Sequence, residues 1–318
     1  MENLLHFLGD RAVAWSAMIL KPSMLASVAF LILLLVIDIH RRGWKLSWSR
    51  RAVEGALATI AIFHVNFLLL PLVWLSLALV QDGYDALGIP RIPADAWSGF
   101  PTWALVVIAI LAHDFANYWN HRFMHLPWIW PIHAIHHSDP DVNGLTGYRV
   151  HALEALVMWS SYVLLLTWLG LPPDAIGIGA VFVALHVIYV HIDVDWGHGP
   201  FAMLIASPRF HRWHHADVEE LYGKNLANIF PFFDWMFGTY HVPGACKATL
   251  GARGVPQNDV IKLMLWPILE WMRMAREALV AGKAGSGAGY RDTAPPQQQA
   301  VGTAASLDTV LDIEPVNR

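Results

Sequence analysis

Charged residues are scarce in this sequence of 318 residues. Only 14% of them are Asp, Glu, Lys or Arg, whereas 56% are hydrophobic. Ordinary soluble domains carry about 25% charged residues. The formal net charge is −4, so the chain has no excess of cations with which to neutralise a phosphate backbone. These shortages argue against a soluble globular protein, and we expect no nucleic acid partner.

Cysteine is almost absent, because Cys246 is the only one. A single thiol cannot form an intrachain disulfide, and it cannot supply the several thiolates of a structural Cys-based zinc site or an iron–sulfur cluster. The sequence also lacks the H-E-x-x-H motif of zinc hydrolases and the G-x-G-x-x-G fingerprint of nucleotide-binding proteins. Redox chemistry would therefore need electrons from another protein.

Long apolar segments are abundant. A membrane-spanning helix needs about 20 mostly apolar residues, and we predict five spans, with an error of one, at 23–39, 52–80, 102–118, 152–169 and 175–190. Five Lys and Arg residues follow the first span at 41–51, and the positive-inside rule places such a loop in the cytoplasm. By alternation, the segments after residues 118 and 190 also lie on the cytoplasmic side. In a bacterium, the membrane would be the inner one.

The expected fold is all-α, a multi-pass membrane helical bundle of about four or five spans with a cytoplasmic helical cap that carries a histidine-rich dimetal site. We expect four regions: N-terminal transmembrane (1–100), catalytic (101–245), amphipathic or interfacial helix (246–281) and a disordered tail (282–318). The segment 260–280 mixes apolar residues, two Trp and five charged residues, a composition that favours the membrane interface. Packing against the catalytic region is the alternative for this segment.

Histidine is the polar residue in excess. Thirteen of the 17 histidines lie between His113 and His215, and eight of these form the strings HRFMH (121–125), HAIHH (133–137) and HRWHH (211–215). Residues at i, i+3 and i+4 share one face of a helix, and imidazole is a good ligand for Fe, Zn, Cu and Ni. The predicted metal ligands are His121, His125, His133, His136, His137, His191, His211, His214 and His215, with His151 and His186 as further candidates.

This number of histidines exceeds the coordination of one ion. Neighbouring residues such as His136 and His137 point about 100° apart on a helix, so each such pair can serve two ions in one pocket. His113 lies two turns before His121, with Asn117 midway on the same face; it either completes this row or lines a cavity. A ligating histidine donates its second N–H to an acceptor that orients the ring. The candidate acceptors are the carboxylates of Asp114, Asp139, Glu154 and Asp217, each with a solvated or salt-bridged role as the alternative. Asp114, Arg149, Glu154 and Asp217 are the candidates for catalytic roles.

The three strings, together with His191 between the second and third, resemble the histidine boxes of the fatty acid hydroxylase/sterol desaturase superfamily. The resemblance extends to the segments 114–122, 136–139, 148–154, 223–225 and 233–240, and covers roughly 103–242. It implies a membrane-bound non-haem di-iron oxygenase that hydroxylates a lipid C–H bond, or desaturates the lipid at the same site. The implied cofactors are two iron ions, with O₂ as co-substrate. The implied partners are a lipid from the bilayer and a separate electron donor such as a ferredoxin with its reductase.

One position departs from the family pattern. The family often has a second histidine four residues before the one that matches His191, where this chain has Val187. The tenth ligand could be His186, His151, His198, an asparagine or water. A zinc-dependent membrane hydrolase and a metal transporter are the other functional classes. The missing H-E-x-x-H motif weighs against the first, and strings at span ends rather than at the bilayer midplane weigh against the second.

Overall fold

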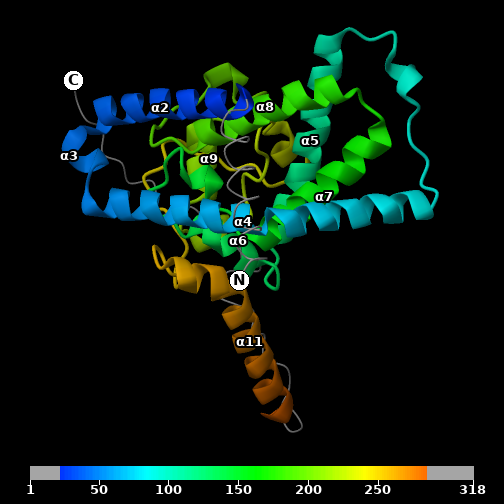
Figure 1. Ribbon diagram of the computed structural model, residues 1–318. Helices are drawn as coiled ribbons and strands as arrows, with labels where there is room; N and C mark the ends of the chain where they lie inside the picture. The colour runs from blue at the N-terminus through cyan, green and yellow to red at the C-terminus, as the bar shows by residue number, and fades with distance from the viewer. Residues whose placement is uncertain (1–21, 285–318) are drawn as a thin grey trace, which may run out of the picture.

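The computed structural model describes residues 22–284 (Figure 1). In this part of the chain, regular structure is helical, apart from one isolated bridge between Ala216 and Leu250. This confirms the predicted all-α class. The predicted tail from residue 285 onward and the first 21 residues lie outside the described part. The helices are α2 (Pro22–Arg42), α3 (Trp44–Ser47), α4 (Arg50–Ala86), α5 (Thr102–Met124), α6 (Trp130–His137), α7 (Ala152–Leu169), α8 (Pro173–Val190), α9 (Pro208–His214), α10 (Phe232–Met236) and α11 (Val260–Ala284).

Long helices in contact with one another form the framework. Figure 1 shows α2 and α4 joined through α3 at one end of the molecule. Helix α2 packs against α8, and α4 packs against α7. Helix α5 packs against both α7 and α8. The short 3₁₀ helix η2 (Thr146–Tyr148) contacts α4 and α8. Helices α5, α7 and α8 thus form a three-helix group beside which the shorter helices α6 and α9 are placed.

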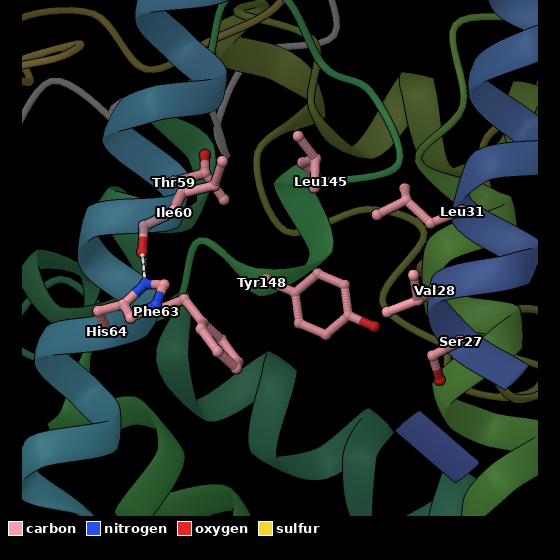
Figure 2. A pocket seen from close by; sticks show the side chains of 9 residues that line it. All are labelled: Ser27, Val28, Leu31, Thr59, Ile60, Phe63, His64, Leu145 and Tyr148. Atoms are coloured by element: carbon pink, nitrogen blue, oxygen red, sulfur yellow. Dashed lines mark hydrogen bonds between the residues drawn. The ribbon is translucent and has the colours of Figure 1, made fainter. Parts of the chain in front are cut away.

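A small apolar cavity of about 140 Å³ separates α2 from α4. Figure 2 shows Tyr148 of η2 reaching into it, between Leu31 on α2 and Phe63 on α4. The Tyr148 and Phe63 rings meet edge to face, with centroids 5.9 Å apart. The contact ties the loop before α7 to the framework.

Three helices of the described chain, α4, α7 and α8, are long and apolar enough to cross a membrane. Much of their apolar surface faces outward, as at Leu57, Leu72 and Leu79 of α4, which are all about 60% exposed. Exposed leucines along a spanning helix suit contact with lipid tails. Each of the five predicted spans corresponds to a helix, and the count of five membrane crossings stays a prediction.

A tight turn at residues 170–172 joins α7 to α8. Helix α7 ends at Gly170, whose φ of 60° is left-handed, and α8 starts at Pro173 after Pro172. A Cβ at Gly170 would lie 2.2 Å from the carbonyl oxygen of Ile92. Both the backbone conformation and the close approach therefore require glycine at this C-cap. After this turn, α8 packs against α5, as α7 does before it.

Helix α11 contacts the rest of the protein through its first half and extends away from it, as Figure 1 shows. Leu263 is fully buried in a cluster with Ile62 of α4 and Ile135 of α6. Other apolar residues of α11 are exposed, among them Leu265, Ile268 and Met272. One face of the helix thus packs against the helix that carries the second histidine string, and another apolar face is left uncovered in the described chain.

We expect Leu263→Ala to destabilise the protein, because it removes a buried leucine and leaves a cavity beside α6. Such changes cost about 2–5 kcal/mol. Leu265→Ala is the matched control, since Leu265 is 47% exposed two residues further on. Thermal unfolding in detergent should show a clearly lower Tm for the first variant and little change for the second. Equal Tm values would contradict the packing described for α11.

Candidate metal centre

Histidines from four helices meet at one place in the structure. Some lie in the last turn or at the C-cap of the long helices α5 and α8. The others lie in the short helices α6 and α9 or at the C-cap of α9. They are His121 and His125 from α5, His133, His136 and His137 from α6, His191 from the C-cap of α8, and His211, His214 and His215 from α9 and its C-cap.

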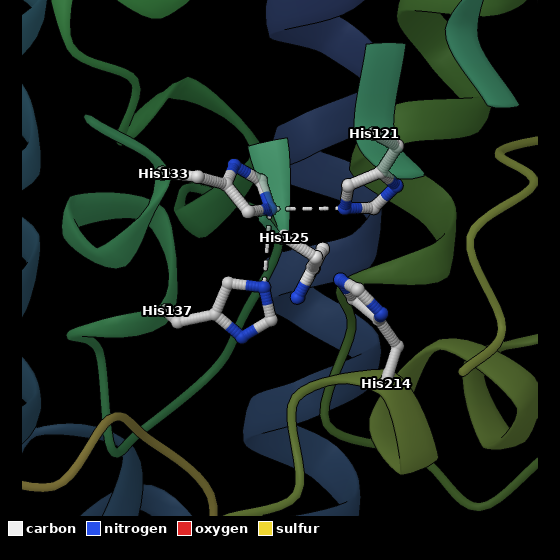
Figure 3. A group of neighbouring side chains, drawn as sticks. All are labelled: His121, His125, His133, His137 and His214. Carbon is white, nitrogen blue, oxygen red and sulfur yellow. Dashed lines mark hydrogen bonds between the residues drawn. The ribbon is translucent and has the colours of Figure 1, made fainter. Parts of the chain in front are cut away.

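The first group consists of His121, His125, His133, His137 and His214. One ring nitrogen of each lies within 4.8 Å of those of the others. Figure 3 shows the five rings arranged around a common centre. The Nε2 atom of His133 lies 2.9 Å from Nε2 of His121 and 3.2 Å from Nε2 of His137.

The second group consists of His136, His191, His211 and His215, all of them buried. The Nε2 atom of His191 lies 3.2 Å from that of His136 and 2.9 Å from that of His211. The Nε2 atoms of His211 and His215 are 3.1 Å apart. Four imidazole nitrogens therefore converge on a second centre.

Histidines that are adjacent in the sequence belong to different groups. His137 belongs to the first and His136 to the second, while His214 belongs to the first and His215 to the second. The rings of His137 and His215 stack with centroids 4.5 Å apart, so the groups are adjacent. This is the arrangement that the helical spacing predicts for two ions in one pocket.

Backbone carbonyls fix the orientation of several rings. The Nδ1 atom of His121 lies 2.7 Å from the Leu226 carbonyl oxygen, and that of His191 lies 2.7 Å from the Val187 carbonyl oxygen. In the same way, Nδ1 of His214 lies 2.8 Å from the Lys224 carbonyl oxygen. A carbonyl oxygen only accepts, so each Nδ1 carries the proton, and the neutral ring presents a lone pair at Nε2.

The imidazoles of both groups are neutral. Burial, followed by the neighbouring imidazoles, holds the pKa of His137 and that of His215 well below the ordinary value. The same causes lower the pKa of His136, His211 and His214 well below that value. A neutral imidazole is the form that binds a metal ion.

The donor set fits a pair of metal ions. Nε2 lone pairs that face each other at 2.9 Å, as in His121 and His133, repel unless a cation lies between them. Metal–nitrogen bonds of about 2.0–2.1 Å place neighbouring ligand nitrogens about 2.9–3.4 Å apart, and the distances here are 2.9–3.2 Å. The Nε2 atoms of His125 and His214 are buried and have no hydrogen-bond partner among the described residues.

Glu154 is the predicted carboxylate that contacts a histidine of these groups. Its Oε1 atom lies 2.8 Å from Nδ1 of His133, and both side chains are buried. With the proton on Nδ1, the contact leaves the lone pair of His133 at Nε2, toward the first centre. The position of Glu154 in the first turn of α7 places this acceptor directly behind α6.

The three other residues predicted for catalytic roles lie elsewhere. Asp114 is fully buried and accepts hydrogen bonds from the backbone N–H groups of residues 228, 229 and 230, at 2.7–3.0 Å. Arg149, also fully buried, donates from Nε to the Ser138 hydroxyl at 2.9 Å. Asp217 accepts from the Tyr222 hydroxyl at 2.6 Å and pairs with Arg253. Their contacts hold loops rather than ligands.

The two further candidate ligands, His151 and His186, are not part of either group. His151 caps the N-terminus of α7, where its Nδ1 accepts from the Leu153 N–H at 3.1 Å. His186 is buried within α8 and stacks on Phe182. It precedes His191 by five residues, a spacing that turns it away from the face that carries His191. His198 bonds to the Tyr189 hydroxyl, so no described histidine takes the tenth position.

A cavity of about 190 Å³ lies directly against both groups. Three helices line it with residues at a spacing of four: His113, Asn117 and His121 of α5; Glu154, Met158 and Tyr162 of α7; and Val183, Val187 and His191 of α8. His113 therefore lines the cavity, the second of the two roles that the sequence left open. Gly147 of η2 closes one side, where a Cβ would approach Val187 to 2.6 Å.

Sequence reasoning missed two buried residues that hold the loop behind the site. Asn225 has a φ of 56°, and its side chain donates to the carbonyls of Phe210 and His241. Asp234 accepts from the backbone N–H groups of Leu226 and Ala227. This loop supplies the carbonyls that orient His121 and His214. The only signal was their place in GKN and FDWMFGTY, short polar-containing segments close to the histidine strings.

Comparison with known proteins agrees with this geometry. The profile of the family "Fatty acid hydroxylase" matches residues 106–239, a range that contains all nine histidines of the two groups. Residues 106–239 are thus similar to the fatty acid hydroxylase/sterol desaturase superfamily. Together with the three long apolar helices, this similarity indicates an integral membrane protein.

Curated relatives cover the same part of the chain. Alkylglycerol monooxygenase of Danio rerio is 31% identical over 61% of this chain and 42% of its own length. Ornithine lipid hydroxylase OlsE of Rhizobium tropici is 29% identical over 56% of this chain and 54% of its own length. Methylsterol monooxygenase 2-2 of Arabidopsis thaliana is 28% identical over 44% and 54%. The chain spans about half the length of these relatives. No solved structure matches significantly.

We expect His137→Ala to lower the metal content, because it removes a donor from the first group and leaves neighbouring lone pairs uncompensated. His151→Ala is a matched control, since it also removes a buried histidine near the site but none of the nine converging nitrogens. Elemental analysis of purified protein should give about two ions per chain for wild type and for His151→Ala, and clearly fewer for His137→Ala. Retained metal in His137→Ala would falsify the ligand assignment.

Proposed function

We propose that this protein is a membrane-bound non-haem di-iron oxygenase that hydroxylates a C–H bond of a lipid. The observation that carries the proposal is the position of two groups of neutral imidazoles against an otherwise largely apolar cavity between three long helices. An apolar cavity beside redox-active ions suits a hydrocarbon chain as the substrate. The names of the relatives, an alkylglycerol monooxygenase and an ornithine lipid hydroxylase among them, support the same class.

Iron is the proposed metal. His121, His125, His133, His137 and His214 would hold one ion, and His136, His191, His211 and His215 the other. Imidazole alone suits Fe, Zn, Cu and Ni, and the similarity of the chain to the superfamily favours iron. When bound, the iron pair supplies the oxidising chemistry, in which O₂, two electrons and two protons yield a hydroxylated lipid and one water.

The side chains around the pair have separate tasks. Glu154 holds the Nδ1 proton of His133 and so keeps the lone pair of that ring directed at the first centre. The carbonyls of Leu226 and Lys224 do the same for His121 and His214. Met158, Val183 and Val187 line the cavity with apolar surface, which excludes water and leaves the lipid chain as the preferred occupant.

The site is proposed to lie on the cytoplasmic side of the membrane. The cations around residues 41–51 follow α2, and the histidines lie at the C-terminal ends of α5 and α8 and the N-terminal side of α7. A lipid then enters from the inner leaflet, and a soluble electron donor such as a ferredoxin with its reductase delivers electrons without crossing the bilayer. The exposed apolar face of α11 would lie in the same interface.

Desaturation is the alternative outcome at the same site. Both reactions begin with removal of a hydrogen atom, and the position of the lipid chain decides between oxygen insertion and loss of a second hydrogen. The test is expression in a membrane with a reductant, followed by mass spectrometry of the lipid extract. A gain of one oxygen supports hydroxylation, and a loss of two hydrogens supports desaturation. The His137→Ala protein is the control, and an unchanged lipid extract from wild type would contradict both.

We expect Glu154→Gln to retain the fold and to lose most of the activity. Gln preserves the size of the side chain, but it replaces the carboxyl group behind the His133 ring with an amide, whose oxygen is a weaker acceptor and whose NH₂ group can turn toward Nδ1. Changes to such supporting partners reduce metal affinity or activity about 10–100-fold. Metal titration and turnover should both weaken within that range, while the Tm changes little. Wild-type metal affinity in Glu154→Gln would contradict the supporting role of the carboxylate.

A further inference from the structure

The cavity beside the histidines has a polar end that the proposed chemistry does not use. Its three stripes of residues run parallel to one another, and each begins at the metal-binding end with His121, Glu154 or His191. At the other end, two turns away, α5 contributes His113 and α7 contributes Tyr162. The eight residues between the two ends of each stripe correspond to about 12 Å of helix. The cavity therefore joins the histidine groups to a second polar cluster.

This cluster consists of His113, Asn117 and Tyr162. The rings of His113 and Tyr162 stack with centroids 3.9 Å apart, and the Tyr162 hydroxyl donates to Oδ1 of Asn117 at 2.9 Å. The Nδ1 atom of His113 is buried and has no hydrogen-bond partner among the described residues. Val183 of α8 contributes apolar surface to the same end, and Asn228 of the loop before α10 also lines the cavity.

The three residues of the cluster do not satisfy all of their hydrogen-bonding groups with one another. Because Asn117 accepts from Tyr162 through its carbonyl oxygen, its amide N–H groups and the lone pairs of the Tyr162 oxygen are left for a third group. Burying a histidine nitrogen without a partner is costly. A ligand that carries an oxygen atom to this point would relieve that cost.

We propose that the far end of the cavity binds an oxygen function of the lipid substrate, a hydroxyl or an ether, through His113, Asn117 and Tyr162. This proposal rests on the proposed function, because only a lipid oxygenase would take the bound molecule as its substrate. The cluster then sets the distance between the bound oxygen and the carbon that is oxidised at the histidine end. His113, Asn117 and Tyr162 are specificity-determining residues in this account.

A simple clamp between α5 and α7 is the competing explanation, and the structure contains a matched control for it. Asn120 of α5 donates to the hydroxyl of Ser161 on α7, beside the cluster. Neither residue lines the cavity. Ser161→Ala removes a hydrogen bond between the same two helices without touching the proposed subsite. Tyr162→Phe and His113→Phe remove the polar atoms of the subsite while keeping a ring at each position.

The test is a binding measurement that needs neither O₂ nor a reductant, so it is independent of whether the protein hydroxylates a lipid. Three probes with equal numbers of non-hydrogen atoms are compared: n-nonane, 1-octanol and di-n-butyl ether. Their dissociation constants follow from the shift in the thermal unfolding midpoint of the purified protein in detergent. Wild type should bind one or both oxygen-containing probes about two- to tenfold more tightly than nonane, the range of one hydrogen bond.

We expect the preference to fall to near onefold in Tyr162→Phe and in His113→Phe, and to persist in Ser161→Ala. Stronger binding of the alcohol would identify a hydroxyl as the function recognised, and stronger binding of the ether would identify an ether oxygen. Absence of a preference in wild type, or its persistence in both ring variants, would overturn the proposal. An equal loss in Ser161→Ala would show a general effect of the α5–α7 contact and would overturn it as well.

Discussion

The structure depends on the convergence of nine neutral imidazoles. The Nε2 atoms of seven of them lie 2.9–3.2 Å from another Nε2 atom. The Nδ1 protons of His121 and His191 are held by backbone carbonyls, so the Nε2 lone pair of His121 faces His133 and that of His191 faces His136 and His211. The elements that carry the histidines therefore need a rigid arrangement. Two features provide this rigidity: the contacts of α5 with α7 and α8, and the loop behind the site.

The loop between α9 and α10 is as important to the centre as the helices. Asp114 and Asp234 are buried and together accept five backbone N–H groups of residues 226–230. That fixes the carbonyls of Lys224 and Leu226, which orient His214 and His121. Asp114 on α5 and Asp234 on α10 therefore hold the backbone segment that follows these carbonyls. The cavity on the opposite side of the histidines is bounded by the same α5, so substrate space and metal ligands share one rigid support.

Much of this arrangement was predictable from local pattern. Apolar length gave the positions of α2, α4, α5, α7 and α8, and helical spacing gave the division of His136 from His137 and of His214 from His215 between two centres. Contacts between residues far apart in sequence were not predictable. Asp114 lies next to a histidine string in the sequence, yet its carboxylate accepts from the backbone of residues 228–230, and Asp217 accepts from Tyr222. His151 and His186 have the residue type of a ligand, and only their positions at a helix cap and inside α8 separate them from the nine.

We propose that these imidazoles bind two iron ions side by side. X-ray absorption at the iron edge of the purified, full-length protein tests it most directly, because it reports the donor atoms of the bound metal. We predict a first shell dominated by nitrogen at about 2.0–2.2 Å, with the outer-shell pattern of imidazole rings. A first shell dominated by carboxylate oxygen or by sulfur, or iron without imidazole scattering, would contradict the account.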